Sequence, residues 1–157
     1  MNSDLIELIS TFNQFGIRYM IAGGHAVMYY CEPRYTKDLD IAVASTAEDV
    51  AKLKNALAQF GFAIPDSVIE EFREPNKMLV FGFAPNRVDI LNQLKGIDFE
   101  EAYSRRIDVD FEGIKISMIS LTDLIATKTA TGRPQDLLDL KQLVAKSAEP
   151  IGDRKYP

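Results

Sequence analysis

Two aspartates separated by one residue are the first residues in this sequence whose types and spacing could do chemistry. In Asp38-Leu39-Asp40-Ile41 acidic and apolar residues alternate, and on a β-strand residues two apart point to the same face. The two Cα atoms are then about 6.5 Å apart, so the carboxylates repel each other unless a cation lies between them. Mg²⁺, which takes one or two protein carboxylates, would relieve that repulsion. Two acids that face solvent on a half-exposed strand would give the same pattern.

A glycine pair is the second such feature. Gly23-Gly24 directly follows the apolar run at residues 17–22. A strand, a tight glycine turn and a helix start together place backbone N–H groups where an anion can bind. Because glycine has no side chain, a phosphate could approach the backbone there. An ordinary turn between two elements is the alternative.

A third acid, Asp89, lies in Arg87-Val88-Asp89-Ile90-Leu91. Val88 and Ile90 share one strand face, so Asp89 points to the other. Two interpretations remain open from the sequence. Asp89 forms an ion pair with Arg87, or it is a third metal ligand on a strand next to that of the other two acids.

The elements that must position these residues follow from hydrophobic periodicity. Helices are predicted at residues 3–15, from the glycine pair to about residue 30, from an N-cap at Ser45 or Thr46 to a stop at Gly61, at 98–104, at 121–130 and from Pro134 onwards. Strands are predicted at residues 17–22, 38–43, 78–83, 87–91, 107–111 and 114–118. This order predicts an α+β fold in which helices cover a mixed β-sheet. We expect a single domain over residues 1–148 and a loose tail over 149–157.

The composition limits which ligands the protein could bind and in which cellular compartment it is expected. A net charge of -5 argues against a broad phosphate-binding surface. With a single histidine, any metal must be held by oxygen ligands, which favours Mg²⁺ or Mn²⁺. The single cysteine excludes an internal disulfide. Without a basic leader, or an apolar run near the roughly 20 residues of a membrane span, a cytoplasmic protein with no membrane partner is expected.

These features together resemble the nucleotidyltransferase superfamily that includes DNA polymerase β, kanamycin nucleotidyltransferase and the minimal nucleotidyltransferases. Its pattern is an apolar strand, Gly-Gly or Gly-Ser, a short helix, an acid-apolar-acid strand and a third acid on a later strand. The sequence is most similar to the AbiEii/AbiGii toxin-type branch and to the shorter stand-alone members. The segments that carry this similarity are Gly23-Gly24, residues 34–40 (RYTKDLD), Asp89 and residues 132–140 (GRPQDLLDL).

The resemblance implies transfer of a nucleoside monophosphate from a nucleoside triphosphate (NTP) to an acceptor hydroxyl. Asp38 and Asp40 would bind two Mg²⁺ (or Mn²⁺) ions. Asp89 would bind the metal near the acceptor and assist its deprotonation. Gly23 and Gly24 would pack against the triphosphate.

Further residues are candidates for nucleotide binding. Lys128 lies at the inward edge of its predicted helix and could reach the phosphates, although its ammonium could equally lie in water. Asp136, in the first turn of the last helix, would interact favourably with the helix dipole; the resemblance adds that such a Lys…Asp pair belongs to the site. Arg34 and Lys37 could contact phosphate, but the preferred interpretation is that both are solvated charges in a loop. For His25, beside the glycine pair, we expect capping or packing.

The sequence leaves the acceptor open: RNA, a protein or a small molecule. The toxin-type similarity implies a component of a toxin–antitoxin or abortive-infection system, with a partner protein encoded nearby. Toxin-branch members generally carry a helical C-terminal domain, whereas the stand-alone members match this sequence better in length. The alternative function is a catalytically inactive metal-nucleotide-binding module within a protein complex. A metal-dependent hydrolase that uses the same acids is a third interpretation.

Overall fold

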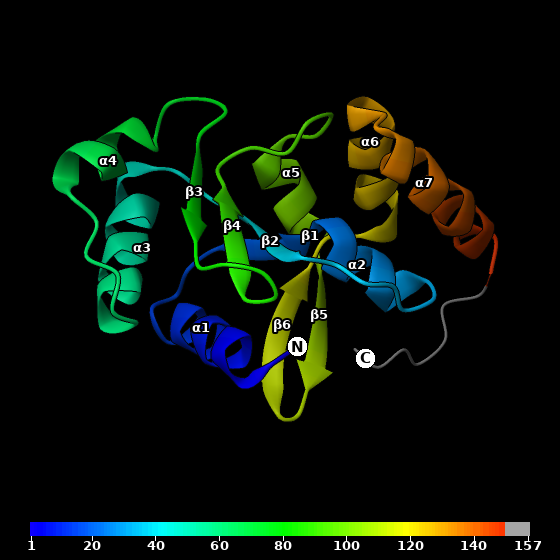
Figure 1. Ribbon diagram of the computed structural model, residues 1–157. Coiled ribbons are helices and arrows are strands. Elements are labelled where there is room, and N and C mark those ends of the chain that lie inside the picture. The colour runs from blue at the N-terminus through cyan, green and yellow to red at the C-terminus, as the bar shows by residue number, and fades with distance from the viewer. Residues whose placement is uncertain (150–157) are drawn as a thin grey trace.

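A six-stranded mixed sheet with strand order β3-β4-β2-β1-β6-β5 forms the centre of the molecule (Figure 1). β2 pairs antiparallel with β1 and parallel with β4, and β1 pairs parallel with β6. The hairpins β3–β4 and β5–β6 form the two ends of the sheet. The computed structural model describes residues 1–149. Its strands are β1 (Tyr19–Ala22), β2 (Asp38–Val43), β3 (Met78–Phe81), β4 (Arg87–Leu91), β5 (Ile107–Phe111) and β6 (Ile114–Met118).

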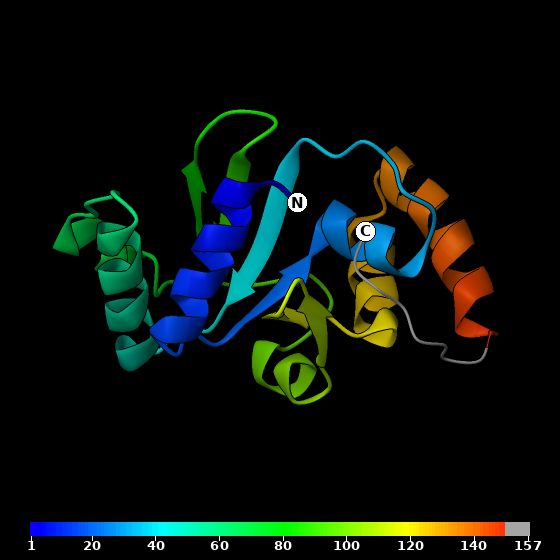
Figure 2. The same cartoon turned by 90° about the horizontal axis from the view of Figure 1, so that it is seen from below.

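All the helices of the described chain except α5 gather in two groups, and α5 lies between them in Figure 1. α1, α3 and α4 lie at one side of the molecule, and α2, α6 and α7 lie at the other (Figures 1 and 2). The predicted α+β class with a mixed sheet is confirmed. The helices are α1 (Ser3–Gln14), α2 (Gly23–Tyr30), α3 (Ala47–Gln59), α4 (Asp66–Glu71), α5 (Phe99–Ser104), α6 (Leu121–Thr131) and α7 (Pro134–Ser147).

Alternation along β2 separates the core from the candidate site. Leu39, Ile41 and Val43 have no solvent exposure and belong to the hydrophobic core, which includes the apolar faces of α1 and α3. Asp38 and Asp40 therefore project from the opposite face of the strand. The burial of one face fixes the register of β2, because a slip of one residue would turn both acids into the core.

Two remaining predictions concern the ends of the chain and the membrane. The predicted tail at residues 149–157 lies outside the described residues from position 150 onwards, and the single-domain boundary at residue 148 stays a prediction. No helix within residues 1–149 combines the length and apolar character that crossing a bilayer would need.

Candidate active site

Three adjacent central strands bring the predicted acids and the glycine pair together. Asp40 on β2 lies directly opposite Asp89 on β4, and Asp38 lies opposite Arg87. On the other side of β2, Asp40 lies opposite Ala22, the last residue of β1, immediately before the glycine pair. The backbone pairing of the sheet therefore collects the separate sequence motifs into one place.

The carboxylates crowd one another. Asp89 is buried and Asp40 is half-buried. Burial, together with the negative charges of Asp89 and Asp38, raises the pKa of Asp40 to about 6, although Lys128 and Arg133 act in the opposite direction. Such crowding favours a cation at this position.

Arg87 supplies one positive charge to this cluster. Its guanidinium donates two hydrogen bonds to Asp89, Nε to Oδ1 at 2.8 Å and Nη2 to Oδ2 at 3.0 Å. Its Nε also lies 3.7 Å from Oδ1 of Asp38. The ion pair that was one interpretation of Asp89 is thus present, and it lies within the acid cluster.

The donor set has the right chemistry for Mg²⁺ but does not form a complete metal site. Within residues 1–149, no three His, Cys, Asp or Glu side chains are arranged to hold a metal ion together. Asp38 and Asp40 are the two acids that a cation could reach without breaking the hydrogen bonds between Arg87 and Asp89. Three oxygen ligands would require Asp89 to turn away from Arg87.

The side chains of other residues pack directly against the backbone of the glycine pair. Gly23 has φ +58°, and a Cβ added there would lie 2.0 Å from Oδ2 of Asp40. A Cβ on Gly24 would lie 2.6 Å from Oγ1 of Thr36 and 3.3 Å from Nη2 of Arg34. Gly23 is therefore required for close packing against the acidic strand, and Gly24 for close packing against the segment before it. The approach of phosphate to them stays a prediction.

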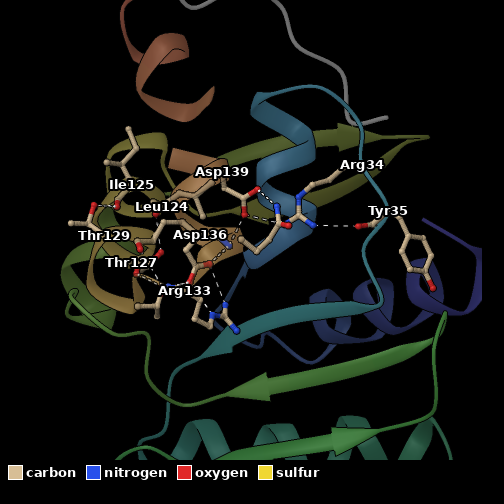
Figure 3. A network of polar contacts seen from close by, with 12 residues as sticks. Arg34, Tyr35, Leu124, Ile125, Thr127, Thr129, Arg133, Asp136 and Asp139 are labelled. Atoms are coloured by element: carbon tan, nitrogen blue, oxygen red, sulfur yellow. Dashed lines mark hydrogen bonds and ion pairs between the residues drawn. The ribbon is translucent and has the colours of Figure 1, made fainter. Parts of the chain in front are cut away.

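Lys128 and Asp136 form a direct ion pair in the interior. The distance between Lys128 Nζ and Asp136 Oδ1 is 2.9 Å, and that between Nζ and Asp139 Oδ2 is 3.0 Å. Burial alone would raise the pKa of Asp136, but hydrogen bonds from Arg133, Lys128 and Thr131 outweigh it and hold that pKa below its usual range. Figure 3 shows this network, in which Asp136 faces Arg133 and Asp139 faces Arg34.

The remaining candidates lie around this network. Arg34 donates from Nη2 to Asp139 at 3.0 Å, so it is linked to α7 rather than solvated. Its Nε is buried and finds no hydrogen-bond acceptor in the described part of the chain. Lys37 is exposed in the segment before β2, as a solvated loop charge would be. His25 is buried in α2, and burial lowers its pKa to about 4.

Two pockets adjoin the acids. One, of about 450 Å³, is lined by the three aspartates and by Arg34, Arg87, Lys128 and Arg133. The other, of about 600 Å³, is lined by Met78 and Leu91 of the β3–β4 hairpin, by the following residues Leu94 and Lys95, and by α6. The residues that border both pockets are Gly23, Asp40, Asp89, Lys128 and Arg133.

Two residues of this site were not among the candidates drawn from the sequence. They are Arg133, which contacts Asp136, and Asp139, which contacts Lys128 and Arg34. The sequence held one signal for Arg133, because an arginine immediately before Pro134 is at the N-terminal boundary of a helix, three residues before Asp136.

A mixed sheet whose central strands place two glycines and three aspartates together defines the nucleotidyltransferase class of protein. The chain matches, over residues 3–147, the family described as nucleotidyltransferase of unknown function (DUF6036), and it belongs to that family. The predicted resemblance to the nucleotidyltransferase superfamily is confirmed.

Solved structures share the fold at low sequence identity. The lincosamide antibiotic adenylyltransferase LnuA, in a lincomycin-bound crystal structure, is 14% identical, with a TM-score of 0.55 over 93% of this chain and 98% of that one. ANT(2")-Ia, in complex with adenylyl-2"-tobramycin, is 13% identical, with a TM-score of 0.58 over 92% and 88%. An antigenic nucleotidyltransferase-like protein from Paracoccidioides brasiliensis is 13% identical, with a TM-score of 0.52 over 90% and 72%. No curated protein matched the sequence.

Proposed function

We propose that this protein transfers a nucleoside monophosphate from an NTP to an acceptor hydroxyl in a Mg²⁺-dependent reaction. The acceptor oxygen forms a bond to the α-phosphate, and pyrophosphate leaves. The observation that carries the proposal is the pairing of Asp40 with Asp89 across β2 and β4, with Asp38 on the same face. Membership of a nucleotidyltransferase family supports it. So does the lining of the smaller pocket, where arginine and lysine lie beside the three carboxylates.

The proposed roles follow from position. Asp38 and Asp40 hold Mg²⁺ or Mn²⁺, which when bound would neutralise charge on the phosphates. Asp89 accepts the proton of the acceptor hydroxyl once Arg87 has released its carboxylate. Gly23 and Gly24 leave space at the strand–helix junction for a phosphate. Of the remaining candidates, Arg34, Lys128 and Asp136 line the nucleotide pocket and form or organise its positively charged side. Lys37 does not line the pocket and has no role in this proposal.

A small molecule is the acceptor that we favour. The larger pocket, about 600 Å³, has the size of a small-molecule site, and it borders Asp89. Its lining combines the apolar side chains of Met78 and Leu91 with polar groups from α6. LnuA and ANT(2")-Ia, which share the fold, were solved with an antibiotic or an adenylylated antibiotic. A toxin role, with RNA or protein as the acceptor and a neighbouring partner protein, is the competing outcome of the acceptor test.

One observation favours the alternative of an inactive binding module. Arg87 already holds Asp89 by two hydrogen bonds, so the third acid faces a guanidinium rather than the position of a metal. If that pair persists when nucleotide is bound, the protein would bind Mg-NTP without transferring it.

The test is nucleotide transfer by Asp89→Asn, with Asp123→Asn as its matched control. Both aspartates are buried and accept two hydrogen bonds from an arginine, but Asp123 lies at the start of α6. Labelled NTPs are offered with Mg²⁺ and with hydroxylated small molecules, RNA or protein. We expect Asp89→Asn to lose transfer by at least about 100-fold, whereas Asp123→Asn keeps it.

Binding is measured separately by titration calorimetry. The double variant Asp38→Asn/Asp40→Asn is expected to lose Mg-NTP binding while its circular dichroism is unchanged. Near-normal transfer by Asp89→Asn would contradict the catalytic role. A wild-type protein that binds Mg-NTP but transfers nothing would establish the binding module instead.

A further inference from the structure

Arg133 and Lys128 are the two cationic residues shared by both pockets, yet their surroundings differ. The Lys128 side chain is only 7% exposed and its ammonium contacts two buried carboxylates, those of Asp136 and Asp139. Arg133 also contacts Asp136, but its side chain is 73% exposed. The Lys128 side chain is thus buried. The Arg133 guanidinium is bound to Asp136 on one side and exposed to solvent on the other.

Three hydrogen bonds to Asp136 hold Arg133 in place. Asp136, whose side chain has no exposure, accepts from Arg133 Nε at 2.8 Å, from Nη2 at 3.3 Å and from the backbone N–H at 3.1 Å. Thr131 and Lys128 donate to the same carboxylate. A guanidinium carries five N–H donors, and Asp136 uses two of them, so the others can donate to a ligand.

The charge of the surrounding network is positive on balance. Arg34, Lys128 and Arg133 contribute three positive charges, and Asp136 and Asp139 contribute two negative ones, which leaves one positive charge. Arg133 is the most exposed of the three cationic side chains, at 73% against 28% for Arg34 and 7% for Lys128. An oriented guanidinium that lines the same pocket as the three carboxylates suits the bidentate binding of phosphate oxygens.

We propose that Arg133 binds the phosphates of the nucleoside triphosphate, and that Lys128 and Asp136 position Arg133 rather than contact the nucleotide. The inference rests on the proposed function and changes the role of Lys128 within it. In this proposal the N-cap residue of α7 carries the phosphate-binding group, and it lines the same pocket as Asp40.

The deciding variants are Arg133→Gln and Arg133→Lys, with Arg105→Gln as the matched control. Arg105 donates from Nε and Nη2 to the buried Asp123 at 3.0 and 2.8 Å, and its side chain is 48% exposed. The control therefore removes an equivalent pair elsewhere in the molecule. Thermal unfolding of all three variants reports the structural cost, which should be similar for the two glutamine variants.

Calorimetry with ATP, GTP, CTP and UTP, each with Mg²⁺, measures the effect on the ligand. For the NTP that wild type binds most tightly, Arg133→Gln should weaken binding by roughly 10- to 100-fold, the effect of a lost charged hydrogen bond. The corresponding nucleoside, which lacks phosphates, should show no difference between wild type and variant. The affinity of Arg133→Lys for Mg-NTP should lie between those of wild type and Arg133→Gln. The affinity of Arg105→Gln should equal that of wild type.

The outcomes separate the two proposals. If wild type binds an NTP and Arg133→Gln binds it equally well, the assignment of Arg133 is overturned and the proposed function stands. An equal loss for nucleoside and NTP would also overturn the assignment, because it would show a general disturbance of the pocket. If wild type binds no NTP, the proposed function itself fails.

Discussion

Arginine–aspartate pairs with two hydrogen bonds recur in this molecule, and their neighbours distinguish their roles. Arg18 with Asp49 and Arg105 with Asp123 fix the starts of α3 and α6, where each aspartate also bonds to the N-cap residue of its helix. Arg87 with Asp89 has the same geometry but lies among other carboxylates. The pair alone therefore says nothing about function. Function is indicated by the additional carboxylates of Asp38 and Asp40 beside the pair of Arg87 with Asp89.

His25 provides a prediction at the scale of one residue. Burial, the chain N-terminus and Arg34 lower its pKa from 6.5 to about 4. Because the folded-state pKa is below the unfolded one, the unfolded chain binds a proton first as the pH falls. Stability is therefore lost between about pH 6.5 and 4, by up to about 3 kcal/mol.

The measurement is an NMR titration, which is unambiguous because the sequence contains one histidine. The ring resonances should shift with a midpoint near pH 4. A midpoint near 6.5 would show that the ring is solvated. In urea denaturation, His25→Asn should flatten the loss of stability below pH 6.5, unless the ring is essential for packing, in which case stability would fall at every pH.

At the scale of the secondary structure element, the junction of β1 and α2 makes a sharp prediction. Gly23→Ala should destabilise the protein more than Gly16→Ala. Both positions have similar backbone strain for alanine, with φ of +58° and +66°, but an added Cβ meets Asp40 at 2.0 Å only at Gly23 and nothing within 4 Å at Gly16. The expected difference in the free energy of unfolding is about 1–3 kcal/mol, the usual cost of overpacking.

Urea denaturation of the two variants measures this difference. Combining Gly23→Ala with Asp40→Ala should recover part of the loss, because the smaller side chain removes the collision. Equal costs at Gly16 and Gly23 would mean that Asp40 moves aside freely, and that the glycine serves only the turn.

The elements themselves were largely predictable from the sequence, but their pairing was not. Apolar alternation gave β2 its bounds, Asp38–Val43, and showed which residues share a face. Nothing in the alternation says that β2 pairs with β4, since register depends on the tertiary packing of both strands. The short α4 was missed, because a six-residue helix with one buried residue, Ile69, leaves almost no periodic signal.

The candidate site divides in the same way. Asp38, Asp40 and Asp89 became candidates because strand geometry fixes which face their side chains share, and the resemblance to nucleotidyltransferases implied their role as metal ligands. The surroundings of Lys128 and Arg34 depend on how α6, α7 and the segment before β2 meet, which local sequence does not determine. Two buried carboxylates on one lysine could not be predicted without that packing.

At the scale of the whole molecule, the buried hydrophobic residues run from Leu5 to Leu143. The family match covers a similar range, residues 3–147. We therefore predict that a protein truncated after Ala148 unfolds in one transition, with a free energy within about 0.5 kcal/mol of the full chain. Guanidinium denaturation of both proteins provides the comparison.

A shorter truncation is the control for that measurement. Ending the chain at Gln142 removes Leu143, which has no solvent exposure, and should cost at least about 2–5 kcal/mol. A clear loss of stability in the protein that ends at Ala148 would contradict the predicted domain boundary and place part of the core beyond it.

The position of Arg87 between Asp38 and Asp89 has a consequence for the life of the protein in the cell. In small zinc domains the chain stays unfolded until its ion arrives. Here the guanidinium of Arg87 partly neutralises the aspartates. The chain can therefore fold without a bound metal ion. Under the proposed function, a chelator would therefore abolish nucleotide transfer without unfolding the protein.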